Sequence, residues 1–328
     1  MRFQVVMEKP TVISTFAGCG GSSLGYQMAG FRELLAVEWD DNAVETFKLN
    51  FPDVLVYHGD IAELSSGECM KLAGIKAGEL DVLDGSPPCQ GFSTAGKRKF
   101  DDPRNSLFQH FARLLSELQP KVFVMENVTG MIKGCMKQAY LTIIKTLRDC
   151  GYRARGEVLN AMYFNVPQSR ERVIIIGVRE DLNIEPSHPK PQTRPMNVKE
   201  AWKGLTETHQ NLMPPVTGKT LQALLKCKQG QSVADFKGSG FSNIRISFMK
   251  PCPALLKTLA FNRYPGMFHP KESRGITIDE AKRIASFPDD FIFQGRYGEA
   301  WARIGNSVPP NLMKAIAEHI RDEILSKA

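Results

Sequence analysis

The first half of the chain alternates short β-rich runs with helical stretches, and this alternation restricts its fold more than any other feature. The runs are Val12–Phe16, Leu34–Trp39, Val54–Asp60, Val82–Ser86, Val122–Val128, Arg155–Asn160 and Val173–Val178. Several are continuously apolar, as is typical of strands that are covered on both faces. The stretch Gln109–Leu118 between two of them carries apolar residues at helical spacing. The alternation predicts an α/β fold with a doubly wound, mostly parallel sheet.

The pattern changes after Val178. Helix and strand breakers follow it at Pro186, Pro189, Pro191, Pro195, Pro214, Pro215, Gly230, Gly238 and Gly240. A long α/β alternation cannot pass through so many breakers. We therefore expect a smaller, loop-rich domain at 186–258 and a core domain made of 1–185 and 259–328. The last apolar helical stretch, Leu312–Leu325, is expected to dock on the core.

The basic residues concentrate in the segment 186–258. The whole chain has a net charge of +7, and this segment holds eleven Lys and Arg against three Asp and Glu, a net charge of +8. A basic segment beside a nearly neutral core is typical of a module that binds a polyanion. Charge alone fits a solvated lysine-rich surface equally well.

The cysteines and apolar runs exclude several classes of protein. The seven cysteines are scattered and form no CxxC pair, so neither a disulfide framework nor a metal site is expected. Such usage fits a reducing cytoplasm. The densest apolar stretch, Val173–Val178, is too short to cross a bilayer, and Met1–Pro10 has no apolar signal segment. We expect no membrane association.

A glycine-rich turn, FAGCGG, occupies residues 16–21 between a strand and a helical stretch. Its glycines allow close approach of a ligand, and a helix N-terminus favours anionic groups. Glu38 ends the next strand, where it can accept hydrogen bonds from ribose hydroxyls. Ser23 stands where a dinucleotide fingerprint has its third glycine, which favours an adenosyl compound over NAD. A glycine turn without a ligand is the alternative.

Cys89 lies in the block GSPPCQGFS, residues 85–93, at the carboxyl end of a predicted strand. Ligands bind at that edge of an open α/β sheet. Two prolines restrict the backbone before Cys89, so its sulfur is expected to be presented to a ligand. The alternative is the buried, inert state in which most free cysteines are found.

Charged residues follow or precede two more strands. Glu126 closes an apolar strand, where an acid either caps a structural element or takes part in proton transfer. Arg170 and Arg172 alternate in the block QSRERV, residues 168–173, so one can face the site while the other pairs with Glu171. A surface ion pair is the alternative.

Taken together, the blocks resemble those of bacterial DNA (cytosine-5) methyltransferases. FAGCGG, PPCQGFS, ENV, QSRERV and GNSVPP occur in the family's order and span residues 16–310. The resemblance implies a nucleophile at Cys89, a contact of Glu126 with N3 and N4 of cytosine, and a contact of Arg172 with O2. Gln90 and Arg170 belong to the same predicted catalytic group.

The resemblance also implies S-adenosylmethionine as the methyl donor. The residues that would line its pocket are Phe16, Gly18, Cys19, Gly20, Gly21, Glu38, Trp39, Asp60, Ile61, Pro88, Leu107, Asn306 and Val308. Asp60 would bind the adenine amino group. The segment 186–258 would be the target-recognition domain, and double-stranded DNA the partner.

The expected protein is a monomeric, cytoplasmic bacterial enzyme that works at the nucleoid, either in a restriction-modification system or as a solitary or phage-borne methylase. Three alternatives remain open at this point. A transfer-RNA methyltransferase shares most blocks, although the basic segment favours duplex DNA. A catalytically silent DNA-binding regulator would not need Cys89, Glu126 and Arg172 together. A nicotinamide dehydrogenase explains the glycine turn but neither PPCQ nor ENV.

Overall fold

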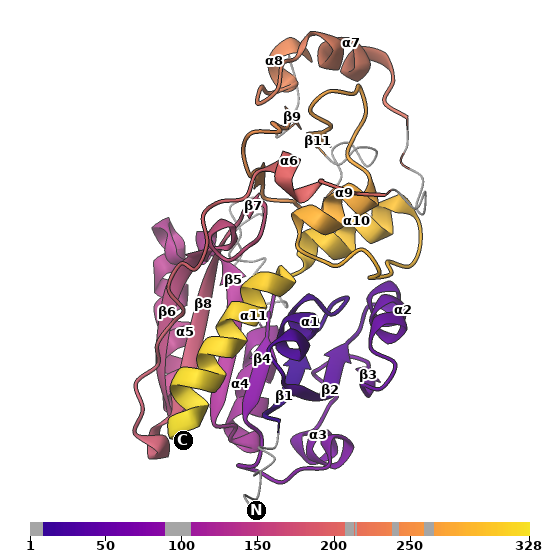
Figure 1. Ribbon diagram of the computed structural model, residues 1–328. Helices are drawn as coiled ribbons and strands as arrows, with labels where there is room; N and C mark the ends of the chain where they lie inside the picture. The colour runs from indigo at the N-terminus through magenta and orange to yellow at the C-terminus, as the bar shows by residue number, and fades with distance from the viewer. Residues whose placement is uncertain (1–8, 89–105, 207–212, 214, 238–242, 259–265) are drawn as a thin grey trace, which may run out of the picture.

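The computed structural model describes residues 9–88, 106–206, 213, 215–237, 243–258 and 266–328. Its centre is a seven-stranded sheet in the order β3-β2-β1-β4-β5-β8-β6 (Figure 1). The strands are β1 Thr11–Thr15, β2 Arg32–Glu38, β3 Val56–His58, β4 Val82–Gly85, β5 Val122–Val128, β6 Tyr152–Asn160 and β8 Glu171–Arg179. β1 to β5 run parallel, whereas β8 is antiparallel to both of its neighbours. The predicted α/β fold with a mostly parallel sheet is confirmed.

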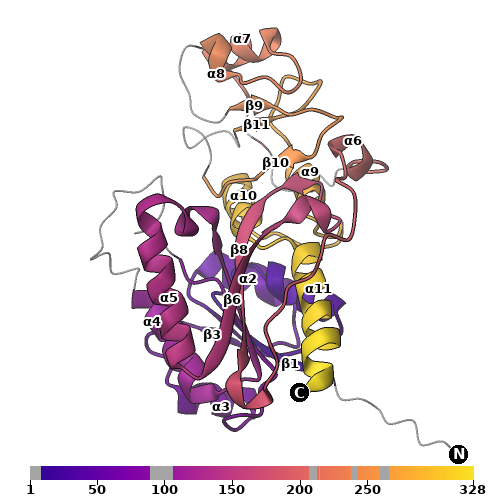
Figure 2. The ribbon, with the colours of Figure 1, turned by 90° about the vertical axis from the view of Figure 1, so that its left-hand side faces the viewer.

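Helices cover both faces of the sheet. Figure 2 shows α4 and α5 on one side and α11 on the other. The helices of this core are α1 Gly21–Met28, α2 Asp41–Asn50, α3 Ser66–Ala73, α4 Ser106–Leu118, α5 Lys137–Asp149 and α11 Pro310–His319. The chain continues helically after α11 through Ile320–Ile324. The C-terminal helix therefore docks on the core as predicted, and it buries Leu312 and Ile316 there.

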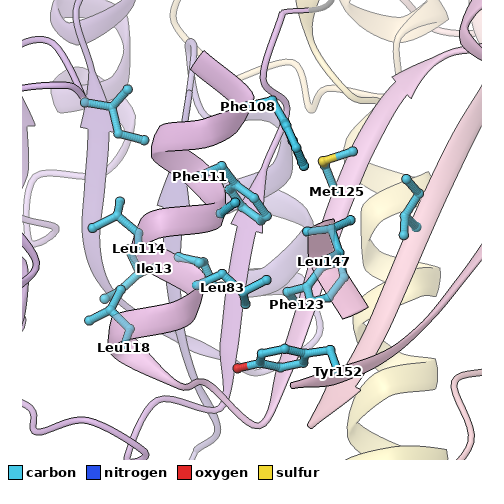
Figure 3. Packing of buried hydrophobic residues seen from close by; sticks show 14 of the residues in the cluster. Ile13, Leu83, Phe108, Phe111, Leu114, Leu118, Phe123, Met125, Leu147 and Tyr152 are labelled. Carbon is cyan, nitrogen blue, oxygen red and sulfur yellow. The ribbon is translucent and has the colours of Figure 1, made fainter. Parts of the chain in front are cut away.

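Successive residues of the central strands enter two different clusters. Ile13 and Leu83 pack with Phe111 of α4, as Figure 3 shows. Their neighbours Val12 and Val82 pack on the opposite face with residues of α11. Because side chains alternate across a strand, a strand that is buried on both sides must be apolar at every position. This explains the continuous apolar runs of the sequence.

A smaller lobe rises above the carboxyl edge of the sheet (Figure 1). It contains α6 Val198–Ala201, α7 Gly218–Lys226, α8 Ala234–Lys237, and the paired strands β9 Ile244–Arg245 and β11 Met267–Phe268. Its own small core includes Leu224, Val233 and Phe268. The domain boundaries 186–258 stay a prediction. The strand Met267–Phe268, which lies outside these boundaries in sequence, pairs with β9 of the lobe.

Four further elements lie between the lobe and the core. These are β7 Gln168–Ser169, which pairs in parallel with β10 Cys252–Pro253, together with α9 Ile278–Ile284 and α10 Tyr297–Asn306. A shared apolar cluster includes Cys252, Ile278 and Trp301, along with Phe47 of α2. This apolar cluster therefore packs the elements below the lobe against α2 of the core. Within the described part of the chain, no helix has the length and apolar character needed to span a membrane.

Candidate active site

A cavity of about 760 Å³ opens where the parallel strands end and the smaller lobe begins. This is the edge at which open α/β sheets bind ligands. The predicted site residues that line it are Phe16, Gly18, Cys19, Gly21, Glu38, Trp39, Asp60, Ile61, Pro88, Leu107, Glu126, Arg170, Arg172, Asn306 and Val308. Gly20 is not among the lining residues, and Cys89 and Gln90 lie outside the described residues. One cavity thus joins residues from all five sequence blocks.

The glycine-rich turn follows β1 with an unusual backbone. Phe16, Gly18 and Gly20 have positive φ angles of 54°, 57° and 94°. Phe16 holds this conformation with a side chain present, which is rare and marks a strained position. Gly20 has a packing role, because a Cβ atom there would collide with the ring of Phe51. The turn is thereby pressed onto α2 and leaves Gly18 and Gly21 at the cavity.

Glu38 holds this turn through its carboxylate. Oε2 accepts a hydrogen bond from the Gly18 amide at 2.7 Å, and Oε1 accepts from the amides of Trp39 and Asp40 at 2.9 Å each. A carboxylate has about four acceptor positions, so three amides leave capacity for one more donor. The side chain is buried apart from its cavity face. Glu38 is therefore fixed in place and still able to accept a hydroxyl group.

An aromatic and an acidic side chain complete this end of the cavity. Trp39 is 74% exposed although it is large and apolar. Asp60 accepts a hydrogen bond from the Ala62 amide through Oδ1 at 2.9 Å, and no bond to its other oxygen is formed within the described residues. Ile61 and Leu107 form an apolar part of the cavity wall. An exposed indole beside a carboxylate suits a flat heterocycle that carries an amino group.

Cys19 is buried behind the turn. Its Sγ lies 3.1 Å from Oγ of Ser307, and its side chain is 1% exposed. Burial raises the pKa of the Cys19 thiol to about 11. It therefore stays protonated near neutral pH and is a poor nucleophile. Its contact instead attaches the glycine-rich turn to the block that begins at Gly305.

Glu126 and Arg172 form an ion pair at the other end of the cavity. Oε1 of Glu126 lies 2.7 Å from Nε of Arg172, and the two side chains are 12% and 14% exposed. The register of β5 and β8 pairs Val128 with Arg172, so the two charged residues are diagonal neighbours on one face. The positive charge of Arg172 balances the charge of the Glu126 carboxylate and orients that carboxylate. Both side chains line the cavity.

Asn127 fixes the segment that leads to Cys89. Its Nδ2 donates to the carbonyl of Pro87 at 3.0 Å, and its side chain is buried. Pro87 and Pro88 both line the cavity. The end of β5 therefore holds the end of the neighbouring strand β4 at the point where the predicted nucleophile follows.

Comparison with known proteins identifies this arrangement. The family model described as C-5 cytosine-specific DNA methylase matches residues 10–322. The chain belongs to this family. It is a DNA cytosine-5 methyltransferase, and the recognition made from the sequence blocks is confirmed.

Relatives match this methyltransferase over most of their length. Type II methyltransferase M1.HphI of Haemophilus parahaemolyticus is 35% identical over 94% of this chain and 86% of its own. Type II methyltransferase M.DdeI of Desulfomicrobium norvegicum is 34% identical over 94% and 88%. The crystal structure of a DNA modification methyltransferase encoded within an E. coli prophage superposes with a TM-score of 0.80 at 26% identity, covering 97% of this chain and 100% of that one.

Arg170 of the methyltransferase binds backbone rather than Glu171. Its guanidinium group is buried and donates to the carbonyls of Leu255 and Gly305 at 2.8 and 3.0 Å. Burial lowers the pKa of Arg170 to about 9. Both arginines line the cavity, but only Arg172 pairs with an acidic side chain there, and neither forms an ion pair with Glu171 within the described residues. A part of Arg170 in catalysis stays a prediction.

Three residues of the cavity region escaped the sequence reasoning. Asn127 lies inside the ENV block, where the sequence pattern indicates a role only for Glu126. Arg303 pairs with Asp40 through two contacts of 2.9 and 3.1 Å, and their separation in sequence hides this pair. Lys257 lines the cavity as well. In the sequence it is one of the eleven basic residues of 186–258, and no motif distinguishes it from the others.

Proposed function

We propose that this DNA methyltransferase transfers a methyl group from S-adenosylmethionine to C5 of a cytosine that is flipped out of a short duplex target, through a transient bond between Cys89 and C6. The observation that carries the proposal is the shared cavity. The wall made by the glycine-rich turn, Glu38 and Trp39 lies in the same space as the Glu126–Arg172 pair. A donor and a base can therefore meet there.

The described residues fit the proposed donor. The cavity lies within the range of ligand sites, roughly 300–1,000 Å³. Glu38 has acceptor capacity for ribose hydroxyls, Asp60 for an adenine amino group, and Trp39 offers an aromatic face. Gly21 and Ser22, at the N-terminus of α1, line the cavity, and the N-terminus of a helix suits a carboxylate. Bound S-adenosylmethionine would supply a methyl group on a positively charged sulfur, activated for transfer to carbon.

The chain's own groups would activate the cytosine. The Cys89 thiolate forms a bond to C6, and the displaced electron pair moves into the ring toward N3, where Glu126 shares a proton with the base. Arg172 orients Glu126 and donates to O2. S-adenosylmethionine held by Glu38, Asp60 and Trp39 would supply the methyl group to C5 of this adduct and would leave as S-adenosylhomocysteine. A base then takes the C5 proton, the electrons reform the C5–C6 double bond, and the sulfur of Cys89 leaves.

The substrate must reach the cavity as an extruded nucleotide, because C5 and C6 of a stacked cytosine are inaccessible to a thiol. The smaller lobe beside the cavity supports a DNA-reading role. Exposed lysines on it include Lys199, Lys219, Lys226 and Lys228. Arg245 does not belong to this surface, since it is buried and donates to the Leu224 carbonyl at 2.8 Å.

The Type II names of the relatives support a role in a restriction-modification system, and the prophage origin of the structural neighbour supports a phage-borne role. We also propose that the enzyme acts as a monomer in the bacterial cytoplasm. Gel filtration with and without target DNA tests whether the enzyme is a monomer.

The covalent step is tested with Cys89→Ser. We expect this variant to lose turnover, while wild-type enzyme forms an SDS-stable adduct on DNA that carries 5-fluorocytosine. Cys150→Ser is a matched control, because Cys150 does not line the cavity. Normal turnover by Cys89→Ser, or no adduct with wild type, would contradict the mechanism.

The substrate is tested separately. Bisulfite sequencing of DNA from cells that express the enzyme should show protected cytosines within one short motif. Purified enzyme should incorporate labelled methyl groups into plasmid DNA and not into transfer RNA. Preferential labelling of transfer RNA would overturn the proposal.

A further inference from the structure

The cations that border the cavity differ in their bonding. Among the described residues they are Arg170, Arg172, Lys257 and Arg303. The three guanidinium groups are already bonded, two to carboxylates and one to backbone carbonyls. Lys257 forms neither an ion pair nor a side-chain hydrogen bond with any described residue, and it is exposed. Lys257 therefore lines the cavity with an ammonium that has no partner among the described residues, and this group is available to an anion that enters with the substrate.

The backbone that carries Lys257 is firmly held. The indole N–H of Trp301 donates to the Leu256 carbonyl at 2.9 Å, and Leu255 is fully buried. Gly305 lies directly against this segment, since a Cβ atom there would be 2.5 Å from the Leu256 oxygen and 2.7 Å from the Lys257 nitrogen. The ammonium therefore extends from a fixed base, which lowers the entropy lost when it binds a ligand.

The proposed substrate brings its anions to this wall. A flipped nucleotide enters the cavity with its base, and its two flanking phosphates remain at the rim. We propose that Lys257 binds a backbone phosphate next to the flipped cytosine and so positions the base against Glu126. This inference rests on the proposed function. It adds a phosphate-binding residue that comes from the segment returning from the smaller lobe.

The donor's carboxylate is the other anion within reach of the cavity. The N-terminus of α1, whose residues Gly21 and Ser22 line the cavity, already suits such a group. Lys257, by contrast, is exposed and follows directly on Leu256, whose side chain is 53% exposed. A solvent-accessible position suits the phosphate of a large polymer better than the carboxylate of an enclosed small molecule. The tests below separate the two anions.

The first test measures DNA affinity against salt concentration. Lys257→Gln should reduce the slope of log Kd against log salt by about one, and weaken DNA binding roughly tenfold at low salt. Lys257→Arg should keep most of the slope. Lys71→Gln removes the same charge from an exposed position on α3 that does not line the cavity, and should match wild type. A wild-type slope for Lys257→Gln would overturn the inference.

The second test locates the phosphate. In the target found by bisulfite sequencing, single phosphates beside the cytosine are replaced by neutral methylphosphonates. One replacement should weaken wild-type binding roughly tenfold and leave Lys257→Gln nearly unaffected, because the contact is already lost. Equal penalties in both proteins at every position would refute the contact.

The third test concerns the donor. Titration calorimetry with S-adenosylhomocysteine in the absence of DNA should give the same Kd for wild type and Lys257→Gln. Weaker binding by the variant, with an unchanged DNA salt slope, would assign Lys257 to the donor's carboxylate and overturn the inference. A failure of the proposed function is distinguishable, because the wild-type enzyme itself would then leave cytosine unmethylated.

Discussion

Glu126 and Arg172 meet across two antiparallel strands, with the carboxylate oxygen 2.7 Å from the guanidinium nitrogen. The strands bring them from positions 46 residues apart in sequence to diagonal positions of one ladder. A second nitrogen of the arginine donates to the Glu171 carbonyl at 2.7 Å, which limits rotation of the guanidinium plane. The Glu126 carboxylate is thus oriented by Arg172, whose guanidinium group is itself bonded to both Glu126 and the Glu171 carbonyl.

We expect Glu126→Gln to lower kcat by roughly a hundredfold or more, because the amide keeps the shape but cannot hold or share a proton with N3. Donor affinity should remain as in wild type. Arg172→Met should lower kcat similarly, and the double variant should lose little beyond either single variant, since the pair acts as a unit. Fully multiplicative losses in single-turnover kinetics would show that the two residues act independently.

A second prediction concerns the contact between α1 and α11. A Cβ atom on Gly25 would lie 2.6 Å from Cβ of Met313 and 2.8 Å from the carbonyl oxygen of Pro310. We expect Gly25→Ala to lower the free energy of unfolding by about 1–3 kcal/mol, because the α11 backbone must move to make room. Urea denaturation measures the change.

Gly67 in α3 provides the matched control, because a Cβ atom there would meet nothing within 4 Å. Gly67→Ala should stabilise the protein by roughly 0.5–1 kcal/mol through helix propensity alone. Similar effects of the two substitutions would refute the close-packing argument.

The sheet and the position of the cavity were predictable because they depend on local pattern. Strands that are buried on both faces must be apolar at every position, so residues 122–125, the buried part of β5, are visible as an apolar run. The carboxyl ends of parallel strands share an edge, which brings Glu38 and Glu126 to one cavity. Neither inference requires knowledge of distant contacts.

The bonding of individual residues was not predictable in the same way. Arg170 binds carbonyls of residues 85 and 135 positions away, and any residue type supplies a carbonyl. Likewise, nothing around Gly20 in sequence indicates that the ring of Phe51 excludes a side chain there. Such contacts follow from packing between segments that sequence pattern does not place relative to one another.

A third prediction uses two acids that contact α1, the partly buried Glu33 and the buried Asp84. Burial raises the pKa of Glu33 to about 7 and that of Asp84 well above its usual value. Glu33 accepts a hydrogen bond from Ser23 at 2.9 Å, and Asp84 from Tyr26 at 3.3 Å. The folded state therefore keeps protons that the unfolded chain releases, so the free energy of unfolding falls as pH rises from 4.5 toward about 7.

Glu33→Gln should remove part of this fall, because the amide does not ionise. We expect its melting temperature to exceed that of wild type at pH 8 and to approach it at pH 5. Glu45→Gln, at an exposed position of α2, should follow the wild-type curve. Parallel curves for Glu33→Gln and wild type between these pH values would show that Glu33 ionises freely in the folded protein.

The last prediction concerns Arg170, which joins the β7–β8 connection to two segments of the cavity wall. Arg170→Ala leaves the carbonyls of Leu255 and Gly305 without their donor, so we expect a loss of about 2–5 kcal/mol in the free energy of unfolding. Donor affinity should also fall, because Asn306, the residue after Gly305, lines the cavity. Arg32→Ala, at an exposed position of β2, should change stability by less than about 0.5 kcal/mol. Wild-type stability and donor affinity in Arg170→Ala would mean that these hydrogen bonds do not hold the wall.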